Sequence, residues 1–415
     1  MVLRIPKIPL LDDINPRNAK VLLRIDINSP IDHRTGKIID NIRLKAHVDT
    51  IRELVIERNC AVTLIAHQGR PGDKDFCDLS QHAELLSKYV GLEIKFIDDV
   101  IGPAAREAIN KLKPGEVLLL DNVRFVSEEL IEALPEKQAE TYLVRRLAPL
   151  FNYYVNDAFG TAHRSQPSIV GFPLKLPSAA GRLMELEVKA LSKAFSESSQ
   201  PRIFVLGGGK VYDTLRIIEN IVKNKVADRI LTTGLVAQLF LVAKAVNIGE
   251  VNKEFLEEKG LLGLVPRARR LLLLGAPIET PIDFKTVDKN GNIRNETVGN
   301  IKGLIMDIGD NTITMYSDLI KEANVVVMRG PAGVMEDPRF REGTEKLVKA
   351  ALMSKAFTIL GGGHLTAIIS WEEAKRRGNT HLSTGGGALL LFLAGEPLPA
   401  LEALHLSAKK FLKIN

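Results

Sequence analysis

Short apolar runs alternate with amphipathic segments along the first half of the chain. Each run is bounded by glycine, proline or polar residues, which is typical of strands buried in a parallel sheet. Between the first two runs, Leu44, Val48, Ile51 and Leu54 recur at helical spacing. The pattern predicts strands at residues 20–27, 61–66, 94–97, 116–120 and 153–156. It predicts helices at residues 43–58, 79–90, 102–112 and 128–150, and a hairpin-like segment that ends at residue 41.

The alternation stops at residues 165–180, which are rich in proline, glycine and serine, and we interpret this stretch as a connection between domains. A linking helix is predicted at residues 181–195. Asn290-Gly291 predicts a hairpin within the segment 276–305. The restarted pattern predicts strands at residues 202–206, 229–232, 270–274, 324–328 and 356–360, with helices between them. A last helix-forming run covers residues 388–394.

Strand and helix alternate on both sides of the connection, which predicts an α/β fold with parallel sheets and right-handed crossovers. The two halves are of comparable size and similar kind. We therefore predict one domain at residues 1–180 and a second at residues 181–399.

Three apolar segments in the second half end in glycine triplets, at residues 207–209, 361–363 and 385–387. Ligands of open parallel sheets bind at the carboxyl ends of the strands. Glycines before a helix N-terminus let an anion approach the backbone N–H groups closely. One triplet alone is explained equally well by a tight turn, but three such strand ends favour a site for one polyphosphate. We interpret the second half as a nucleotide domain.

Strand ends in the first half carry arginine and histidine instead of glycine triplets. Any one of these residues is more simply explained as a surface or ion-pair residue, but so many similar charges in one place would repel one another. Arginine binds carboxylate and phosphate groups through two parallel hydrogen bonds. The convergence predicts a pocket for a small molecule with several negative charges. The residues are Arg24, Asp26, Asn28, Arg43, His67, Arg70, Arg124, His163 and Arg164.

Composition narrows the class of protein. The 415 residues carry a formal net charge of +6, but the basic residues do not form runs, and one Trp and six Tyr offer little for base stacking. Nucleic acid is therefore not an expected partner, whereas small anionic substrates are. Cys60 and Cys77 show neither metal-ligand spacing nor a disulfide framework. This use of cysteine makes a reduced, cytoplasmic setting the expectation. We also see no signal peptide and no membrane-length apolar run.

A phosphoryl group passed between the two predicted sites needs alignment and charge neutralisation above all. No side chain stands out as a general base. An acceptor that is already ionised, such as a carboxylate, would need none.

Seven motifs occur along the chain in this order: VLLRIDIN, AHQGRPG, LLLDNVRF, NDAFGTAHR, VLGGGKV, RGPAGVMED and HLSTGGGA. In their order and approximate spacing they resemble phosphoglycerate kinase, over essentially the whole chain. The resemblance implies two Rossmann-like parallel-sheet α/β domains joined by a hinge helix. The first would bind phosphoglycerate, with the tail at residues 400–415 packed back on it, and the second would bind the nucleotide.

The implied reaction is reversible in-line phosphoryl transfer between 1,3-bisphosphoglycerate and ADP, giving 3-phosphoglycerate and ATP, with hinge closure. Magnesium on the nucleotide would be the cofactor. The implied enzyme is cytoplasmic and glycolytic, acts on small molecules without nucleic acid or membrane, and is a monomer or homodimer.

The resemblance also implies a role for each matched residue. Arg43, Lys210, Gly363 and Gly386 would stabilise the transferring group. The phosphoglycerate would be held by Arg24, Asp26, Asn28, Arg43, His67, Arg70, Arg124 and Arg164. The nucleotide would be held by Gly208, Lys210, Gly234, Leu235, Glu336, Gly362, Gly363, His364 and Leu365.

Several positions depart from the family's common pattern. Thr214 stands where a second lysine is frequent, and Arg329 stands where asparagine is expected. His364 and Leu365 replace an Asp-Thr pair whose aspartate usually lies near magnesium, and this histidine suggests the archaeal branch. Since histidine is a poor magnesium ligand, we predict no protein side chain as a metal ligand. One hypothesis is that Arg329 supplies the positive charge lost at Thr214.

Other classes predict different features. A nicotinamide dehydrogenase would show G-x-G-x-x-G with an acidic residue about 20 positions later, and a P-loop kinase would show G-x-x-x-x-G-K-[ST]; neither occurs here. The sequence distinguishes poorly between an enzyme and a non-catalytic regulator that binds phosphorylated metabolites. Retention of both Arg43 and Lys210 favours an enzyme.

Overall fold

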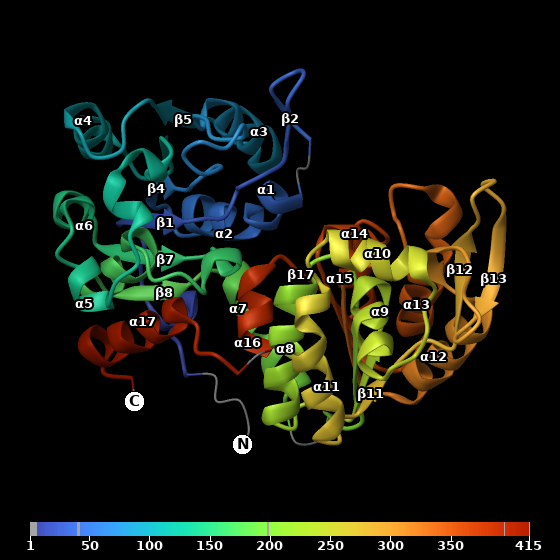
Figure 1. Cartoon of the computed structure of the whole chain (residues 1–415). Helices are drawn as coiled ribbons and strands as arrows, with labels where there is room; N and C mark the ends of the chain where they lie inside the picture. The colour runs from blue at the N-terminus through green and yellow to red at the C-terminus, as the bar shows by residue number, and fades with distance from the viewer. Residues whose placement is uncertain (1–5, 40–41, 197–198, 394, 415) are drawn as a thin grey trace. The chain divides into compact units, whose positions relative to one another are not determined.

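The apolar runs form two parallel sheets of six strands each within the part of the chain that the computed structural model describes (Figure 1). The described residues are 6–39, 42–196, 199–393 and 395–414. Three predicted ends lie outside the described residues. They are the end of the hairpin at residues 40–41, the end of the last helical run at residue 394 and the end of the tail at residue 415. The described chain divides into two compact units, residues 6–189 with 397–414, and residues 190–396. We call these the N-terminal unit and the C-terminal unit.

The sheet of the N-terminal unit has the strand order β5-β6-β4-β1-β7-β8, and every neighbouring pair is parallel. The strands are β1 (Lys20–Arg24), β4 (Ala61–Ile65), β5 (Ile94–Ile97), β6 (Val117–Leu120), β7 (Tyr153–Asn156) and β8 (Ser178–Ala180). Successive residues of a strand face opposite sides of the sheet. Leu23 therefore packs in a core with helices α2 and α3, while Leu22 packs in a second core with α4 and α6.

The helices of this unit are α1 (Ile42–Ala46), α2 (Val48–Arg52), α3 (Ser80–Val90), α4 (Pro103–Lys111), α5 (Pro135–Gln138), α6 (Tyr142–Leu147) and α17 (Pro399–Ser407). Helix α7 (Arg182–Ala194) begins in this unit, and the change of unit falls after Lys189. Strands β2 (Ile31–Asp32) and β3 (Lys37–Ile38) form a small antiparallel hairpin.

The predicted helix 43–58 is broken at His47, which separates α1 from α2, and Glu53–Glu57 continues as a π-helix. The predicted helix 128–150 is wrong as a single element. Its first residues form a 3-10 turn, Ser127–Leu130, and Pro135 starts the short helix α5. Glu128 then accepts hydrogen bonds from the backbone N–H groups of Tyr142 and Leu143, so it closes the start of a new helix, α6.

Two further predictions need correction in this unit. The first strand ends at Arg24, although the apolar pattern extends to residue 27. Residues 165–180 were predicted to be connection only, yet they contain the edge strand β8. Its sequence, Ser-Ala-Ala, lacks the β-branched residues that mark a strand.

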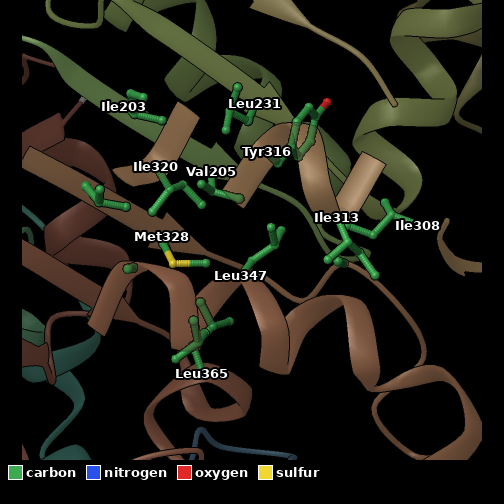
Figure 2. Close-up of a cluster of buried hydrophobic side chains, with 14 of the residues drawn as sticks. Ile203, Val205, Leu231, Ile308, Ile313, Tyr316, Ile320, Met328, Leu347 and Leu365 are labelled. Carbon is green, nitrogen blue, oxygen red and sulfur yellow. The ribbon is translucent and has the colours of Figure 1, made fainter. Parts of the chain in front are cut away.

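The sheet of the C-terminal unit has the order β11-β10-β9-β15-β16-β17 and is parallel throughout. Its strands are β9 (Arg202–Leu206), β10 (Arg229–Thr232), β11 (Ile278–Glu279), β15 (Val325–Arg329), β16 (Phe357–Gly361) and β17 (Thr380–Ser383). Figure 2 shows the core on one face, where Val205 and Met328 of the sheet meet Ile320 and Leu347 from helices.

The helices of this unit are α8 (Val211–Lys223), α9 (Gly234–Ala243), α10 (Glu250–Glu258), α11 (Val265–Leu273), α12 (Asp310–Glu322), α13 (Glu342–Met353), α14 (Gly363–Thr366), α15 (Trp371–Arg377) and α16 (Gly387–Leu393). A separate antiparallel sheet contains β12 (Asp283–Val287), β13 (Ile293–Thr297) and β14 (Leu304–Ile308). The turn at Asn290-Gly291 joins β12 to β13, which confirms the predicted hairpin.

The strand predicted at residues 270–274 is wrong, because these leucines end helix α11. Leu273 is 82% exposed, so the apolar run does not mark a buried strand. The edge strand β11 follows only after Gly275.

Helix α17 belongs to the N-terminal unit, although its sequence follows the whole C-terminal unit. Its Ala400 N–H donates to the carbonyl of Ala162, and Ser407 Oγ donates to the carbonyl of Leu176 at 3.0 Å.

Among the described residues, no helix combines the length and the apolar character needed to span a membrane. The domain boundaries at 180/181 and 399/400 remain a prediction.

Candidate active site

Basic side chains gather at the carboxyl ends of four adjacent strands, β6, β4, β1 and β7, of the N-terminal unit. Arg24 is the last residue of β1, and His67 follows β4. Arg124 follows β6, and Arg164 follows β7. Because neighbouring parallel strands all end at one edge of the sheet, residues far apart in the sequence meet there. We call this set, together with Asp26, Asn28, Arg43 and Arg70, the basic cluster.

Arg24 is fully buried, and each of its guanidinium nitrogens has a partner. Nε donates to Ser168 Oγ at 3.0 Å, one Nη donates to the carbonyl of Ile25, and the other lies 3.1 Å from His67 Nδ1. Burial, and then the positive charge of Arg24 and other arginines, holds the pKa of His67 well below its usual value. A neutral His67 accepts at Nδ1 and keeps Nε2–H as a donor.

Arg43 extends from helix α1 toward the loop after β1. Its guanidinium donates to the carbonyl of Asn28 at 2.9 Å and lies 3.4 Å from a carboxylate oxygen of Asp26. The Asn28 side chain in turn accepts from the N–H of Gly69 at 2.9 Å. Asp26 therefore pairs with Arg43.

Arg124 is 4% exposed, yet its Nε is a buried donor with no hydrogen-bond partner among the described residues. Burial, followed by repulsion from Arg164, Arg24 and Arg70, lowers the pKa of Arg124 to about 10. The buried Nδ1 of His163 likewise has no partner in the described part of the chain. Buried polar atoms without partners are uncommon, so these point to a polar ligand. The excess of positive charge favours an anion there.

Two buried residues behind the basic cluster were missed from the sequence. Glu129 and Ser168 are fully buried, and Ser168 joins the carboxylate of Glu129 to Arg24. Glu129 lies in a segment predicted as an amphipathic helix, where a glutamate indicates an exposed face. Nothing in the local pattern identifies it.

In the C-terminal unit, glycines at three strand ends pack backbone against backbone. The N–H of Gly207 donates to the carbonyl of Arg329, and the N–H of Gly208 donates to the carbonyl of Pro331, each at 2.9 Å. A Cβ on Gly330, which has φ +75°, would lie 2.2 Å from the carbonyl oxygen of Gly207. A Cβ on Gly234, which has φ +56°, would lie 2.9 Å from the backbone nitrogen of Gly208. These glycines join the strand ends to one another.

A second group of glycines faces open space. A Cβ added to Gly209, Gly362, Gly363 or Gly386 would meet no heavy atom within 4 Å. Gly363 and His364 also line a cavity of about 870 Å³ beside helices α13 and α14. A ligand can therefore reach the backbone at these positions, which include the predicted donors Gly363 and Gly386.

The predicted nucleotide residues differ in exposure. Lys210 is exposed at the start of α8, and Glu336 is 75% exposed. A carboxylate oxygen of Glu336 lies 3.6 Å from His364 Nε2, so these two predicted nucleotide residues are neighbours. Leu365 is 1% exposed in the hydrophobic core, which leaves only its backbone for a ligand.

Two departures from the family's pattern have a clear local setting. Thr214 is buried within α8 and donates to the carbonyl of Lys210. Burial lowers the pKa of Arg329, and the negative charge of Asp213 partly opposes this shift.

The side chains do not fit a magnesium site of their own. Magnesium takes oxygen ligands in octahedral geometry. Among the described residues, no group of three or more His, Cys, Asp or Glu side chains could hold a metal ion. Beside the open glycines, the carboxylate of Glu336 has His364 as its neighbour. Any metal at the nucleotide would therefore take most of its ligands from nucleotide phosphates and water.

Comparison with known proteins gives one consistent answer. Residues 11–396 match the family "Phosphoglycerate kinase". The phosphoglycerate kinase of Sulfurisphaera tokodaii is 60% identical over 400 residues, 96% of each chain, and that of Saccharolobus solfataricus is 58% identical over 96% of this chain and 97% of its own. The crystal structure of phosphoglycerate kinase from Pyrococcus horikoshii is 42% identical, with a TM-score of 0.87 over 97% of this chain and 100% of that one.

Proposed function

Since the chain belongs to the phosphoglycerate kinase family and is therefore a phosphotransferase of glycolysis, we propose that the two residue groups described above hold its two substrates. The reaction is reversible phosphoryl transfer between 1,3-bisphosphoglycerate and ADP, which gives 3-phosphoglycerate and ATP. The observation that carries the assignment is the basic cluster, with the unpartnered Nε of Arg124 inside it.

The basic cluster binds the phosphoglycerate. Arginine forms paired hydrogen bonds with carboxylate and phosphate, and each charged group of this substrate is one or the other. Neutral His67 adds a directed donor, and Asp26 with Asn28 holds Arg43 in place. The residues assigned to this site are Arg24, Asp26, Asn28, Arg43, His67, Arg70, Arg124 and Arg164.

The strand ends of the C-terminal unit bind the nucleotide. The open backbone of Gly362 and Gly363 accommodates phosphate groups, and exposed Glu336 accepts from the ribose hydroxyls. Gly234 and Leu235 form the wall for the base at the start of α9. The assigned set is Gly208, Lys210, Gly234, Leu235, Glu336, Gly362, Gly363, His364 and Leu365.

Transfer requires charge stabilisation more than proton transfer, because the acceptor is an ionised carboxylate. Arg43 from one unit and Lys210 from the other neutralise the transferring group, while the N–H groups of Gly363 and Gly386 donate to it. One such donor is worth about 3–4 kcal/mol of transition-state stabilisation. Because these residues belong to different units, hinge motion near residues 165–195 must bring the substrates together and exclude water.

We further propose that magnesium arrives with ATP or ADP and that its ligands there come from the nucleotide. The enzyme acts in the cytoplasm on small molecules, without nucleic acid or membrane, as a monomer or homodimer. Domains at residues 1–180, with the tail 400–415, and at 181–399 would be its moving parts.

The test is a coupled assay of ATP-dependent phosphorylation of 3-phosphoglycerate with wild type and Arg43→Ala. We expect wild-type turnover and a loss of at least about 100-fold in kcat for the variant, since one charged donor to the transferring group is removed. Lys45→Ala is the matched control, because Lys45 is an exposed cation on the same helix. Activity that survives in Arg43→Ala would overturn its role and shift attention to Lys210 and the glycines. An inactive wild type with magnesium and ATP would overturn the assignment of substrates.

A further inference from the structure

A buried chain of hydrogen bonds leads from Arg24 away from the basic cluster to Glu129. Arg24 Nε donates to Ser168 Oγ at 3.0 Å, and that hydroxyl donates to Glu129 Oε1 at 2.5 Å. The other carboxylate oxygen accepts from the N–H of Ser168 at 3.0 Å. The side chains of Arg24, Ser168 and Glu129 are all fully buried.

Glu129 determines the direction of these bonds. A carboxylate only accepts, so it takes both the N–H and the O–H of Ser168. The hydroxyl has one proton, and once this is given to Glu129 its oxygen must accept. Arg24 Nε–H is the donor that it accepts from. The guanidinium plane is thereby fixed on one side by Ser168 and on the other by His67 and the carbonyl of Ile25.

Glu129 also balances charge. Burial raises the pKa of Glu129, while Arg24, the bonds from Ser168 and Arg124 oppose that rise. The groups that face it are Arg24 from β1, Arg124 after β6 and Tyr154 from β7. Tyr154 stays neutral, because burial raises its pKa, and its hydroxyl donates to the carbonyl of Ser168 at 2.7 Å. An uncompensated buried arginine beside other arginines would be costly.

We propose that Glu129, acting through Ser168, is a positioning residue that orients Arg24 for the acidic substrate and supplies its buried counter-charge. This inference rests on the proposed function of the basic cluster as the phosphoglycerate site. Neither residue touches the substrate. Their effect therefore reaches catalysis only through the guanidinium of Arg24.

The experiment measures kcat and the KM for each substrate in Ser168→Ala and Glu129→Gln. Ser168→Ala removes the link and keeps the carboxylate. We expect its KM for 3-phosphoglycerate to rise about tenfold, the effect of one lost hydrogen bond to a charged group, while its KM for ATP stays within about twofold. Glu129→Gln should act in the same direction, because one of the two oxygens that accept from Ser168 becomes an NH2 group, which only donates.

A matched control and a double variant separate positioning from simple structural support. Glu128→Gln changes the neighbouring glutamate, which bonds the backbone of Tyr142 and Leu143 and no arginine, so its KM values should equal those of wild type. In an Arg24→Lys background, Ser168→Ala should add little further loss, because residues that act through one another are not additive. Thermal unfolding of each variant shows that it is folded.

Three results would overturn the inference while wild type remains active: an unchanged KM for 3-phosphoglycerate in Ser168→Ala, an equal rise in the KM for ATP, or additive losses with Arg24→Lys. If Glu129→Gln does not fold, Ser168→Ala and the double variant still decide the matter. Failure of the proposed function is distinct, because wild type itself would then lack activity with 3-phosphoglycerate.

Discussion

At the scale of single residues, burial beside arginines keeps histidines neutral. His67 accepts a hydrogen bond from Arg24. Burial and the positive charge of the cluster hold the pKa of His67 well below its usual value. The pKa of His163 is lowered to about 4 by burial and then by Arg164. These histidines therefore contribute directed hydrogen bonds near neutral pH, and the arginines supply the charge.

His82 is not a member of the basic cluster, so it allows the effect of such burial on stability to be measured without replacing a residue of that cluster. It is fully buried on α3, and burial lowers its pKa to about 4, although Asp78 opposes this. Between pH 6.5 and 4 the unfolded state binds this proton and the folded state does not, so wild type loses stability as the pH falls through that window. We expect His82→Gln to remove on the order of 3 kcal/mol of that loss.

The measurement is the free energy of unfolding in urea at several pH values between 4 and 7. His33→Gln, at an exposed position, is the control and should follow the wild-type curve. Parallel curves for His82→Gln and wild type would show that His82 does not contribute to acid lability.

The residues of the basic cluster could be predicted because each lies at or soon after the end of a strand, or at the start of a helix, in a recognisable motif. Glu129 and Ser168 could not, since their role depends on two irregular turns that meet only in the folded chain. The glycines illustrate a second limit. Sequence treats the three triplets alike, but Gly207 is needed for close backbone packing, while Gly363 and Gly386 leave their backbone open.

At the scale of elements, a buried histidine connects the first helices to the start of α7. His47 Nδ1 lies 2.8 Å from one carboxylate oxygen of Asp157, and the other oxygen accepts from the N–H groups of Leu183 and Met184. His47 Nε2 accepts from the N–H of Asp26 at 3.0 Å. The helix that carries Arg43 is thus tied to the helix that leads into the C-terminal unit.

We expect His47→Ala to lower the free energy of unfolding by about 3–5 kcal/mol, because it leaves one oxygen of the buried Asp157 carboxylate without a donor. His47→Gln, which can donate to Asp157 again, should recover part of the loss. Urea unfolding of the three proteins checks this. A midpoint for His47→Ala equal to that of wild type would contradict the claim that the pair holds α7.

The regular elements were predictable where periodicity was strong. Strands 94–97, 153–156, 202–206 and 229–232 have the predicted bounds. Errors arose where a tertiary contact overrides the local pattern. His47 interrupts a continuous amphipathic pattern because its ring is held by Asp157 and Asp26. The leucines at the end of α11 resemble a strand in sequence, although Leu273 and the next residue, Leu274, are exposed.

At the scale of the whole molecule, the N-terminal unit is built from both ends of the described chain. Helix α17 packs on β8 and on the turns at Pro167–Gly171 and Phe172–Leu174. Leu401 and Leu404 of this helix are 1% and 0% exposed. The turn that α17 covers also carries Ser168, so the helix supports the segment behind the basic cluster.

Leu404→Ala should destabilise the N-terminal unit by about 2–5 kcal/mol, the usual cost of removing a buried leucine side chain. Hydrogen exchange should quicken in β1, β7 and β8, while β9 and β15 of the C-terminal unit serve as an internal reference. Leu406→Ala is the matched control, because Leu406 is 41% exposed on the same helix. Faster exchange in the C-terminal unit alone would show that α17 supports the other unit.

This return of the chain affects the order in which the protein can fold on the ribosome. Ser407 and its partner Leu176 are separated by 231 positions. At roughly 5–20 residues per second, synthesis of that interval takes about 12–46 s. Throughout that time the first-made unit has its sheet but not its covering helix, whereas the later unit is complete as soon as residue 396 emerges. The part of the polypeptide that is translated first is therefore the last to reach its finished form.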